Sequence, residues 1–97
     1  MDITVQELKE RLNKGETFHF LDVREEYEYD EENLGAKLIP LGELPDRMDE
    51  IAGWKDQEVV VHCRSGARSG RAKAFMESQG FTNVRNVLGG IVAYNQL

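Results

Sequence analysis

The chain has 97 residues, of which 31% are charged and 40% hydrophobic, and its 12 basic and 18 acidic side chains leave a net charge of −6 at pH 7. This length and profile predict one globular domain over residues 1–97, and the acidic balance argues against a general nucleic-acid binder or a protein of anionic membranes. Cys63 is the only cysteine, which excludes an internal disulfide and a multi-cysteine zinc site and suits a reducing compartment.

The first predicted elements are a helix and a strand. Thr4 followed by Glu7 has the pattern of a helix-capping box, and apolar residues then recur at helical spacing until Gly15. We expect a very short strand at residues 2–3 before that helix. Residues 18–21 form an apolar run that ends at Asp22, which predicts a strand covered on both faces.

The middle of the chain carries an acidic stretch, a weak strand and a second helix. We interpret residues 25–32, which are mostly acidic, as a solvated loop, with a docking face for a basic partner protein as the alternative. Residues 37–39 predict a strand that Pro40 ends. Apolar residues at helical spacing then indicate a helix between Leu41 and Ile51.

Two further strands and a helix complete the pattern. Residues 58–62 form a strand rich in β-branched side chains, and residues 84–87 form a weaker candidate. A helix is expected from Ala72 until Gly80. Strands that alternate with helices specify an α/β layer of parallel strands, in which ligands bind just beyond the carboxyl ends of the strands. Cys63 directly follows the strongest strand and so occupies that position.

The segment after this strand predicts an anion-binding loop. Small residues, with one glycine free to adopt unusual backbone angles, allow successive N–H groups to turn inward, and the following helix adds the positive end of its dipole. We expect the cysteine to be the catalytic nucleophile at the bottom of this cradle, with the loop binding the substrate. The residues concerned are Cys63, Arg64, Ser65, Gly66, Ala67, Arg68 and Ser69.

A nucleophilic cysteine must ionise near neutral pH. An unperturbed thiol has a pKa of about 8.5, and lowering it by about two pH units takes about 2.7 kcal/mol. One or two hydrogen bonds to a charged group supply about that much. We therefore predict that the loop lowers the pKa of Cys63, with attraction from Arg64 and Arg68.

With these motifs the chain resembles a single-domain rhodanese, a sulfurtransferase that carries sulfur as a cysteine persulfide. The resemblance runs almost end to end and implies a three-layer α/β fold with a small, mostly parallel sheet and helices on both faces. The loop at residues 63–69 and the Gly-Gly segment at residues 88–91 are its specific motifs. The matching stretches are residues 22–25, 40–44, 63–69, 80–84 and 88–91.

What the resemblance implies is transfer of sulfane sulfur without a cofactor or metal. Cys63 would accept sulfur from an anionic donor, such as thiosulfate or a persulfide, and Arg64 and Arg68 would attract that donor. The acceptor would be cyanide, a cellular thiol or a protein, because a chain with one cysteine has no resolving thiol.

Three polar residues near strand ends have structural interpretations. Asp22 and Arg24 are expected to form a buried polar clamp that supports the active loop. His62 is adjacent to Cys63, but neighbouring residues on a strand point to opposite faces, so a direct role as a base is the weaker interpretation.

Two other functions remain as alternatives. Rhodanese-like domains also serve as non-catalytic binding or sensor modules, which usually lack the cysteine. Phosphatases and arsenate reductases of related fold place one residue more between cysteine and arginine than the four that separate Cys63 from Arg68 here, so a phosphate-sized ring is the weaker interpretation. The opening residues show no basic region leading into an apolar run, and we expect a cytoplasmic protein.

Overall fold

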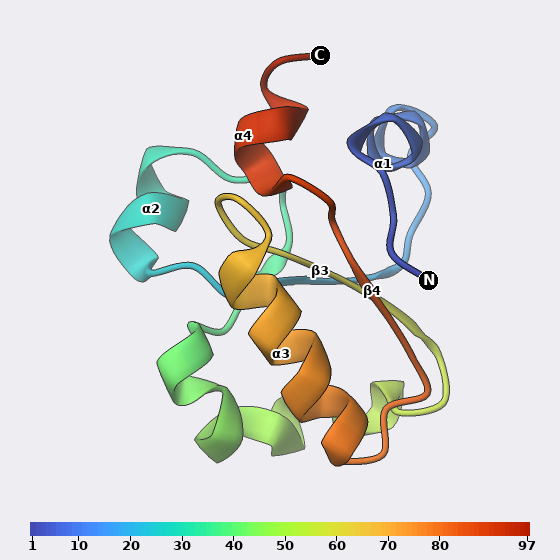
Figure 1. Cartoon of the computed structure of the whole chain (residues 1–97), viewed down its shortest axis with the longest axis vertical. Helices are drawn as coiled ribbons and strands as arrows, with labels where there is room; N and C mark the ends of the chain where they lie inside the picture. Colours follow the sequence, from blue (N-terminus) through green and yellow to red (C-terminus); the bar gives the residue numbers. More distant parts are fainter.

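Helices and strands alternate along the chain, which we describe from a computed structural model covering residues 1–97. The first elements are α1 (Val5–Asn13), β1 (His19–Asp22), α2 (Glu26–Glu31) and β2 (Lys37–Leu38). They are followed by the 3-10 helix η1 (Leu41–Trp54), β3 (Glu58–His62), α3 (Ala67–Ser78), β4 (Asn83–Asn86) and α4 (Gly90–Tyr94) (Figure 1).

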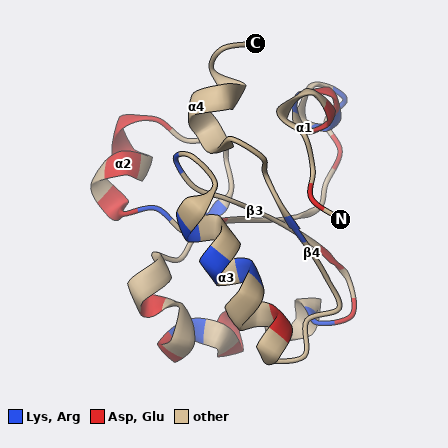
Figure 2. Ribbon diagram, viewed as in Figure 1, with Lys and Arg blue, Asp and Glu red and all other residues tan.

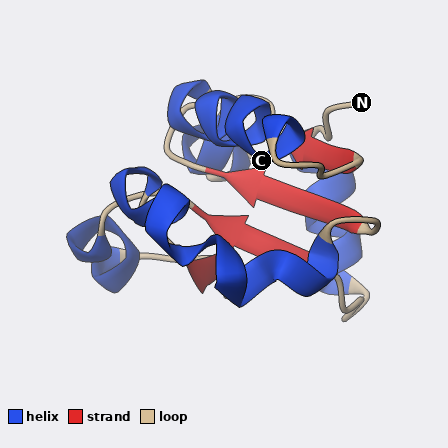
Figure 3. Ribbon diagram, turned by 90° about the horizontal axis from the view of Figure 1, so that it is seen from below, coloured by secondary structure: helices blue, strands red, loops and turns tan.

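The four strands form one parallel sheet in the order β2-β1-β3-β4. Its centre is the pairing of β1 with β3, in which Leu21 lies opposite Val61. A single parallel bridge between Ile3 and Val87 continues the sheet beyond β4, at the place of the short strand expected at residues 2–3. The predicted α/β architecture with parallel strands is confirmed, and Figure 3 shows helices on both sides of the sheet.

Each face of the sheet has its own apolar core. Val59 and Val61 of β3 point to one face, where they pack with residues of α3 and η1. Val60 points to the other face and packs with residues of α1, beside α4. Residues that alternate in direction along a strand are therefore buried on both sides, which explains the nearly continuous apolar runs of β1 and β3.

The acidic stretch forms a helix, so its interpretation as a loop is wrong. Helix α2 has no buried residue and therefore no apolar periodicity by which the sequence could predict it. Its first turn is fixed by the N–H of Glu25, which donates to the carboxylate of Glu28 at 2.9 Å. At its other end the Arg24 guanidinium donates to the carbonyl of Glu32 at 2.8 Å.

Two other helices also differ from expectation. Helix α3 begins at Ala67 rather than Ala72, because Gly66, with a φ of +102°, turns the chain directly into it. The segment predicted as one helix between Leu41 and Ile51 is instead a 3-10 helix that contains Pro45 and is kinked at Arg47. A proline lacks the N–H that an α-helical hydrogen bond needs, which favours the less regular form.

The first helix is capped as predicted, but only from one side. The Thr4 hydroxyl accepts a hydrogen bond from the N–H of Glu7 at 3.2 Å. The reciprocal bond of a capping box is replaced, because the Glu7 carboxylate pairs with Arg85 at 3.0 Å.

None of the helices combines the length and apolar composition that a membrane span requires.

Candidate functional site

The carboxyl ends of the central strands bring three polar residues together. Asp22 ends β1, Asn86 ends β4, and Cys63 directly follows β3 between them. The cysteine is only 1% exposed and lies beneath Arg64 and Ser65, which are exposed. The sulfur therefore lies in the predicted position, but deeper than the bottom of an open cradle.

Two donors point at the Cys63 sulfur. The N–H of Gly66 donates to Sγ at 3.1 Å, and the hydroxyl of Ser69 lies 3.2 Å from the same atom. The positive φ of Gly66, which side-chain-bearing residues rarely adopt, turns the chain into α3 directly after the N–H that faces the cysteine. The loop therefore surrounds the sulfur with neutral hydrogen-bond donors.

These donors outweigh the effect of burial on the thiol. Burial raises the pKa of Cys63, whereas the Ser69 hydroxyl and the N–H groups of Ser69, Gly66 and Ser65 lower it, and the net direction is downward. A group that accepts hydrogen bonds in its charged form ionises more readily. The site thus makes this thiol more acidic than an ordinary cysteine, in the direction that the sequence predicted.

The Gly-Gly segment holds the loop through hydrogen bonds to its backbone. The N–H groups of Ile91 and Val92 donate to the carbonyls of Cys63 and Arg64 at 3.0 and 3.1 Å. A Cβ at Gly90 would lie 2.6 Å from the carbonyl oxygen of Cys63 and equally close to that of Arg64. Only glycine allows the two backbones to approach this closely.

The two arginines of the loop have different surroundings. Arg68 forms a two-pronged ion pair with Glu28 of α2, with distances of 2.6 and 2.9 Å, so the positive charge that was expected to attract a donor is balanced by a neighbouring carboxylate. Hydrogen bonds from Arg68 hold the pKa of Glu28 at about 2. Arg64 is exposed and enters no ion pair, which leaves it as the available cation of the loop.

Asp22 and Arg24 form a buried clamp, as predicted. The Arg24 guanidinium donates to the Asp22 carboxylate at 2.8 Å, and both side chains are nearly inaccessible to solvent. Arg24 also reaches the carbonyls of Glu28 and Glu32. The clamp therefore fastens α2 to the end of β1, and its hydrogen bonds reach α2 rather than residues 63–69.

His62 points away from the sulfur and is fully buried. Its Nε2 lies 3.4 Å from an Asp22 oxygen without forming a hydrogen bond, and its ring packs against Phe20 with centroids 5.2 Å apart. Burial lowers the pKa of His62 more than Asp22 raises it, which favours the neutral ring. A role as the base for Cys63 is not supported by this geometry.

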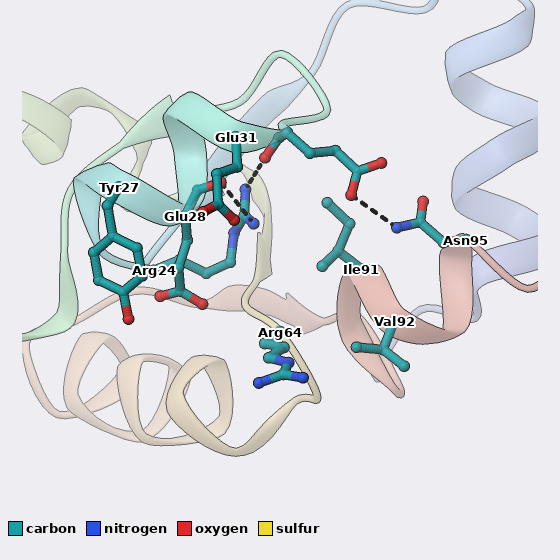
Figure 4. Close-up of a pocket in the computed structure, with 9 residues that line it drawn as sticks. Arg24, Tyr27, Glu28, Glu31, Arg64, Ile91, Val92 and Asn95 are labelled. Carbon is teal, nitrogen blue, oxygen red and sulfur yellow. Dashed lines mark hydrogen bonds between the residues drawn. The ribbon is translucent and has the colours of Figure 1, made fainter.

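A cleft of about 360 Å³ opens beside the loop, between α2 and α4 (Figure 4). Arg64 lines it from the loop, Glu31 and Tyr27 line it from α2, and Val92 lines it from α4. The acidic character of α2 is evident in Figure 2, so the cleft has a negative wall and one free positive group.

Sequence reasoning missed two residues of the site. Asn86 donates from Nδ2 to the carbonyl of Gly66 at 3.1 Å, and its Oδ1 lies 2.5 Å from the Ser69 hydroxyl. Glu28 is the partner of Arg68, 40 positions along the chain. Asn86 ends a predicted strand, and the tendency of strand ends to gather polar residues was the signal that could have identified it.

Comparison with known proteins identifies the family. The rhodanese-like domain profile matches residues 4–97. A sulfurtransferase from Allochromatium vinosum is 38% identical over 94 residues, which cover 96% of this chain and 86% of that protein. The thiosulfate sulfurtransferase PspE from Escherichia coli is 38% identical over 72 residues, covering 73% of this chain and 69% of PspE.

Solved structures agree with the sequence match. The crystal structure of a rhodanese-like domain protein from Staphylococcus aureus superposes with a TM-score of 0.84 at 31% identity, covering 97% of this chain and 91% of that one. The chain belongs to the rhodanese-like family of sulfurtransferases.

Proposed function

We propose that this protein transfers sulfane sulfur through a persulfide on Cys63. The observation that carries the proposal is the pair of donors, the Gly66 N–H and the Ser69 hydroxyl, aimed at a single sulfur atom at the end of β3. Neutral donors around a sulfur favour a thiolate before the reaction and hold a negative charge that develops beside it. One thiol in such a surrounding is suited to carry one extra sulfur.

In the loading step, the Cys63 thiolate attacks the outer sulfur of an anionic donor, thiosulfate or a persulfide. The new Sγ–S bond forms as the donor's S–S bond breaks, and the leaving group, sulfite in the case of thiosulfate, departs with the bonding electron pair. The name of the relative PspE makes thiosulfate the first donor to test. Arg64 is the group that attracts it, because Arg68 is neutralised by Glu28.

In the unloading step, a nucleophilic acceptor attacks the outer sulfur and returns Cys63 to its thiolate. The chain holds no second cysteine, so the acceptor is an external thiol, a protein or, in the test tube, cyanide. The cleft beside Arg64 is the route by which such an acceptor approaches. Neither step needs a cofactor.

The test is to incubate the protein with thiosulfate and measure its intact mass. We expect a gain of one sulfur atom, released as thiocyanate when cyanide is added, and neither signal with Cys63→Ser. A folded protein that gains no sulfur from thiosulfate or from a small-molecule persulfide would instead support a non-catalytic binding module. Cys63-dependent hydrolysis of an aryl phosphate would support the phosphatase alternative.

A further inference from the structure

The Ser69 hydroxyl lies between two acceptors and has one proton to give. It is 3.2 Å from Cys63 Sγ and 2.5 Å from Asn86 Oδ1, and Ser69 is fully buried, so no solvent supplies another donor. A serine hydroxyl donates one hydrogen bond at a time. When it donates to the sulfur it leaves the Asn86 oxygen without a donor, and when it donates to Asn86 it leaves the sulfur with one donor fewer.

The orientation of the Asn86 amide is fixed by a second contact. Its Nδ2 donates to the carbonyl of Gly66 at 3.1 Å, and a rotated amide would place its oxygen against that carbonyl. The backbone N–H of Asn86 donates to Asp2 at 3.0 Å, and Lys73 holds that carboxylate at 2.7 Å. The oxygen of Asn86 is therefore held facing Ser69.

We propose that Asn86 is a positioning residue that competes with Cys63 for the Ser69 proton and so limits how strongly the loop stabilises the thiolate. In the protonated thiol state, the Ser69 hydroxyl donates to Asn86. When the thiol loses its proton, the Ser69 hydroxyl rotates to donate to Sγ. This rotation breaks its short hydrogen bond to Asn86, and the loss of that bond makes the rotation less favourable. Nothing in this competition depends on sulfur transfer, although its importance for catalysis rests on the proposed function.

The charged groups around Cys63 are not altered by a change at Asn86. From α3 the sulfur faces Arg68, which is paired with Glu28 of α2, and Arg64 follows it in the loop. Helix α4 contributes no acidic or basic side chain, since its sequence is Gly-Ile-Val-Ala-Tyr. Arg85 of β4 is paired with Glu7 and Glu58. His62 and the Asp22–Arg24 pair lie on the other side of Cys63 and stay in place.

The test is a double-mutant cycle read by the ultraviolet absorbance of the thiolate as a function of pH. Ser69→Ala and Asn86→Leu are made singly and together, and Asn86→Ala replaces Asn86→Leu if the larger residue impairs folding, as judged by circular dichroism. We expect Ser69→Ala to raise the pKa of Cys63 by about half a pH unit in the natural chain and by about one pH unit in the Asn86→Leu background, where the hydroxyl is free to serve the sulfur.

The cycle separates this competition from a purely structural role of Asn86. Loss of the contact with Gly66 would shift the pKa of Cys63 equally with and without the Ser69 hydroxyl, whereas the proposed competition requires that hydroxyl. An effect of Ser69→Ala that is equal or smaller in the Asn86→Leu background would overturn the proposal. The measurement uses the unloaded protein, so its result is independent of whether sulfur transfer occurs.

Discussion

The unequal surroundings of the two loop arginines predict unequal effects on an anionic donor. Arg64 is exposed, forms no ion pair and lines the cleft, and we expect Arg64→Gln to weaken kcat/KM for thiosulfate. A dianion about 6 Å from a single charge in water gains about 1.4 kcal/mol of attraction, which corresponds to about a tenfold change in rate. A persulfide donor with one negative charge should lose only about threefold.

The salt dependence checks that this effect is electrostatic. The Debye length falls from about 10 Å at 0.1 M to about 3 Å at 1 M salt. The difference in kcat/KM between the natural chain and Arg64→Gln should therefore nearly vanish at the higher salt concentration. The rate of steady-state thiocyanate formation by both proteins, at several salt concentrations, measures this difference. A deficit in Arg64→Gln that is the same at all concentrations would refute a long-range role and indicate a contact that orients the donor.

Two variants serve as matched controls for the positive charge that Arg64→Gln removes. Arg71→Gln removes one exposed positive charge from α3, outside the cleft, and should change kcat/KM by less than about threefold. The joint replacement Glu28→Gln with Arg68→Gln removes a neutral pair and should likewise leave the attraction of thiosulfate nearly intact. Equal losses in Arg71→Gln and Arg64→Gln would mean that net charge, not the position of Arg64, determines the rate.

Three further predictions concern the thiol, the Gly-Gly segment and the buried clamp. Because the hydrogen-bond donors of the loop lower the pKa of Cys63 from its ordinary value, alkylation by iodoacetamide should reach half its maximal rate at a lower pH in the folded protein than in the urea-unfolded chain. The thiolate should also add to the free energy of unfolding above pH 8.5, a contribution that is lost as pH falls through the folded pKa and that Cys63→Ser lacks. Gly90→Ala should cost about 2–4 kcal/mol in urea unfolding, since its φ is +61° and its Cβ meets the Cys63 carbonyl. Arg24→Met should cost about 3–5 kcal/mol in the same assay by leaving the Asp22 carboxylate buried and unpaired, and a loss below about 1 kcal/mol would contradict the importance of the clamp.

The sheet could be predicted from sequence because its signal is local. The apolar runs at β1 and β3 are nearly continuous, since both faces of the sheet are covered, and each ends at a polar residue. The site was predictable for a related reason: Cys63 follows the strongest strand, and Gly66 provides the turn that the loop requires. Both inferences use only neighbouring residues.

The missed features depend on contacts between distant segments. Helix α2 buries no residue and is held by Arg24 and by capping, neither of which produces apolar periodicity. The first turn of α3 lacks apolar periodicity because its polar residues face the site, with Ser69 toward the sulfur and Arg68 toward Glu28. A pattern of charges in the sequence does not say which side chains will pair, so the ion pair of Arg68 with Glu28 could be recognised only from the structure.

The arrangement separates the reactivity of the sulfur from the attraction of the donor. A fixed cation in contact with Cys63 would lower the pKa of the thiol further, but thiolate nucleophilicity falls as the pKa falls, so strong stabilisation slows the attack that it prepares. Here neutral donors act on the sulfur, and Glu28 balances the nearest guanidinium, that of Arg68. In the proposed reaction the remaining cation, Arg64, lines the cleft and attracts the incoming anion. We therefore expect that each function can be altered alone: donor capture by replacing Arg64, and ionisation of the thiol by replacing Ser69 or Asn86.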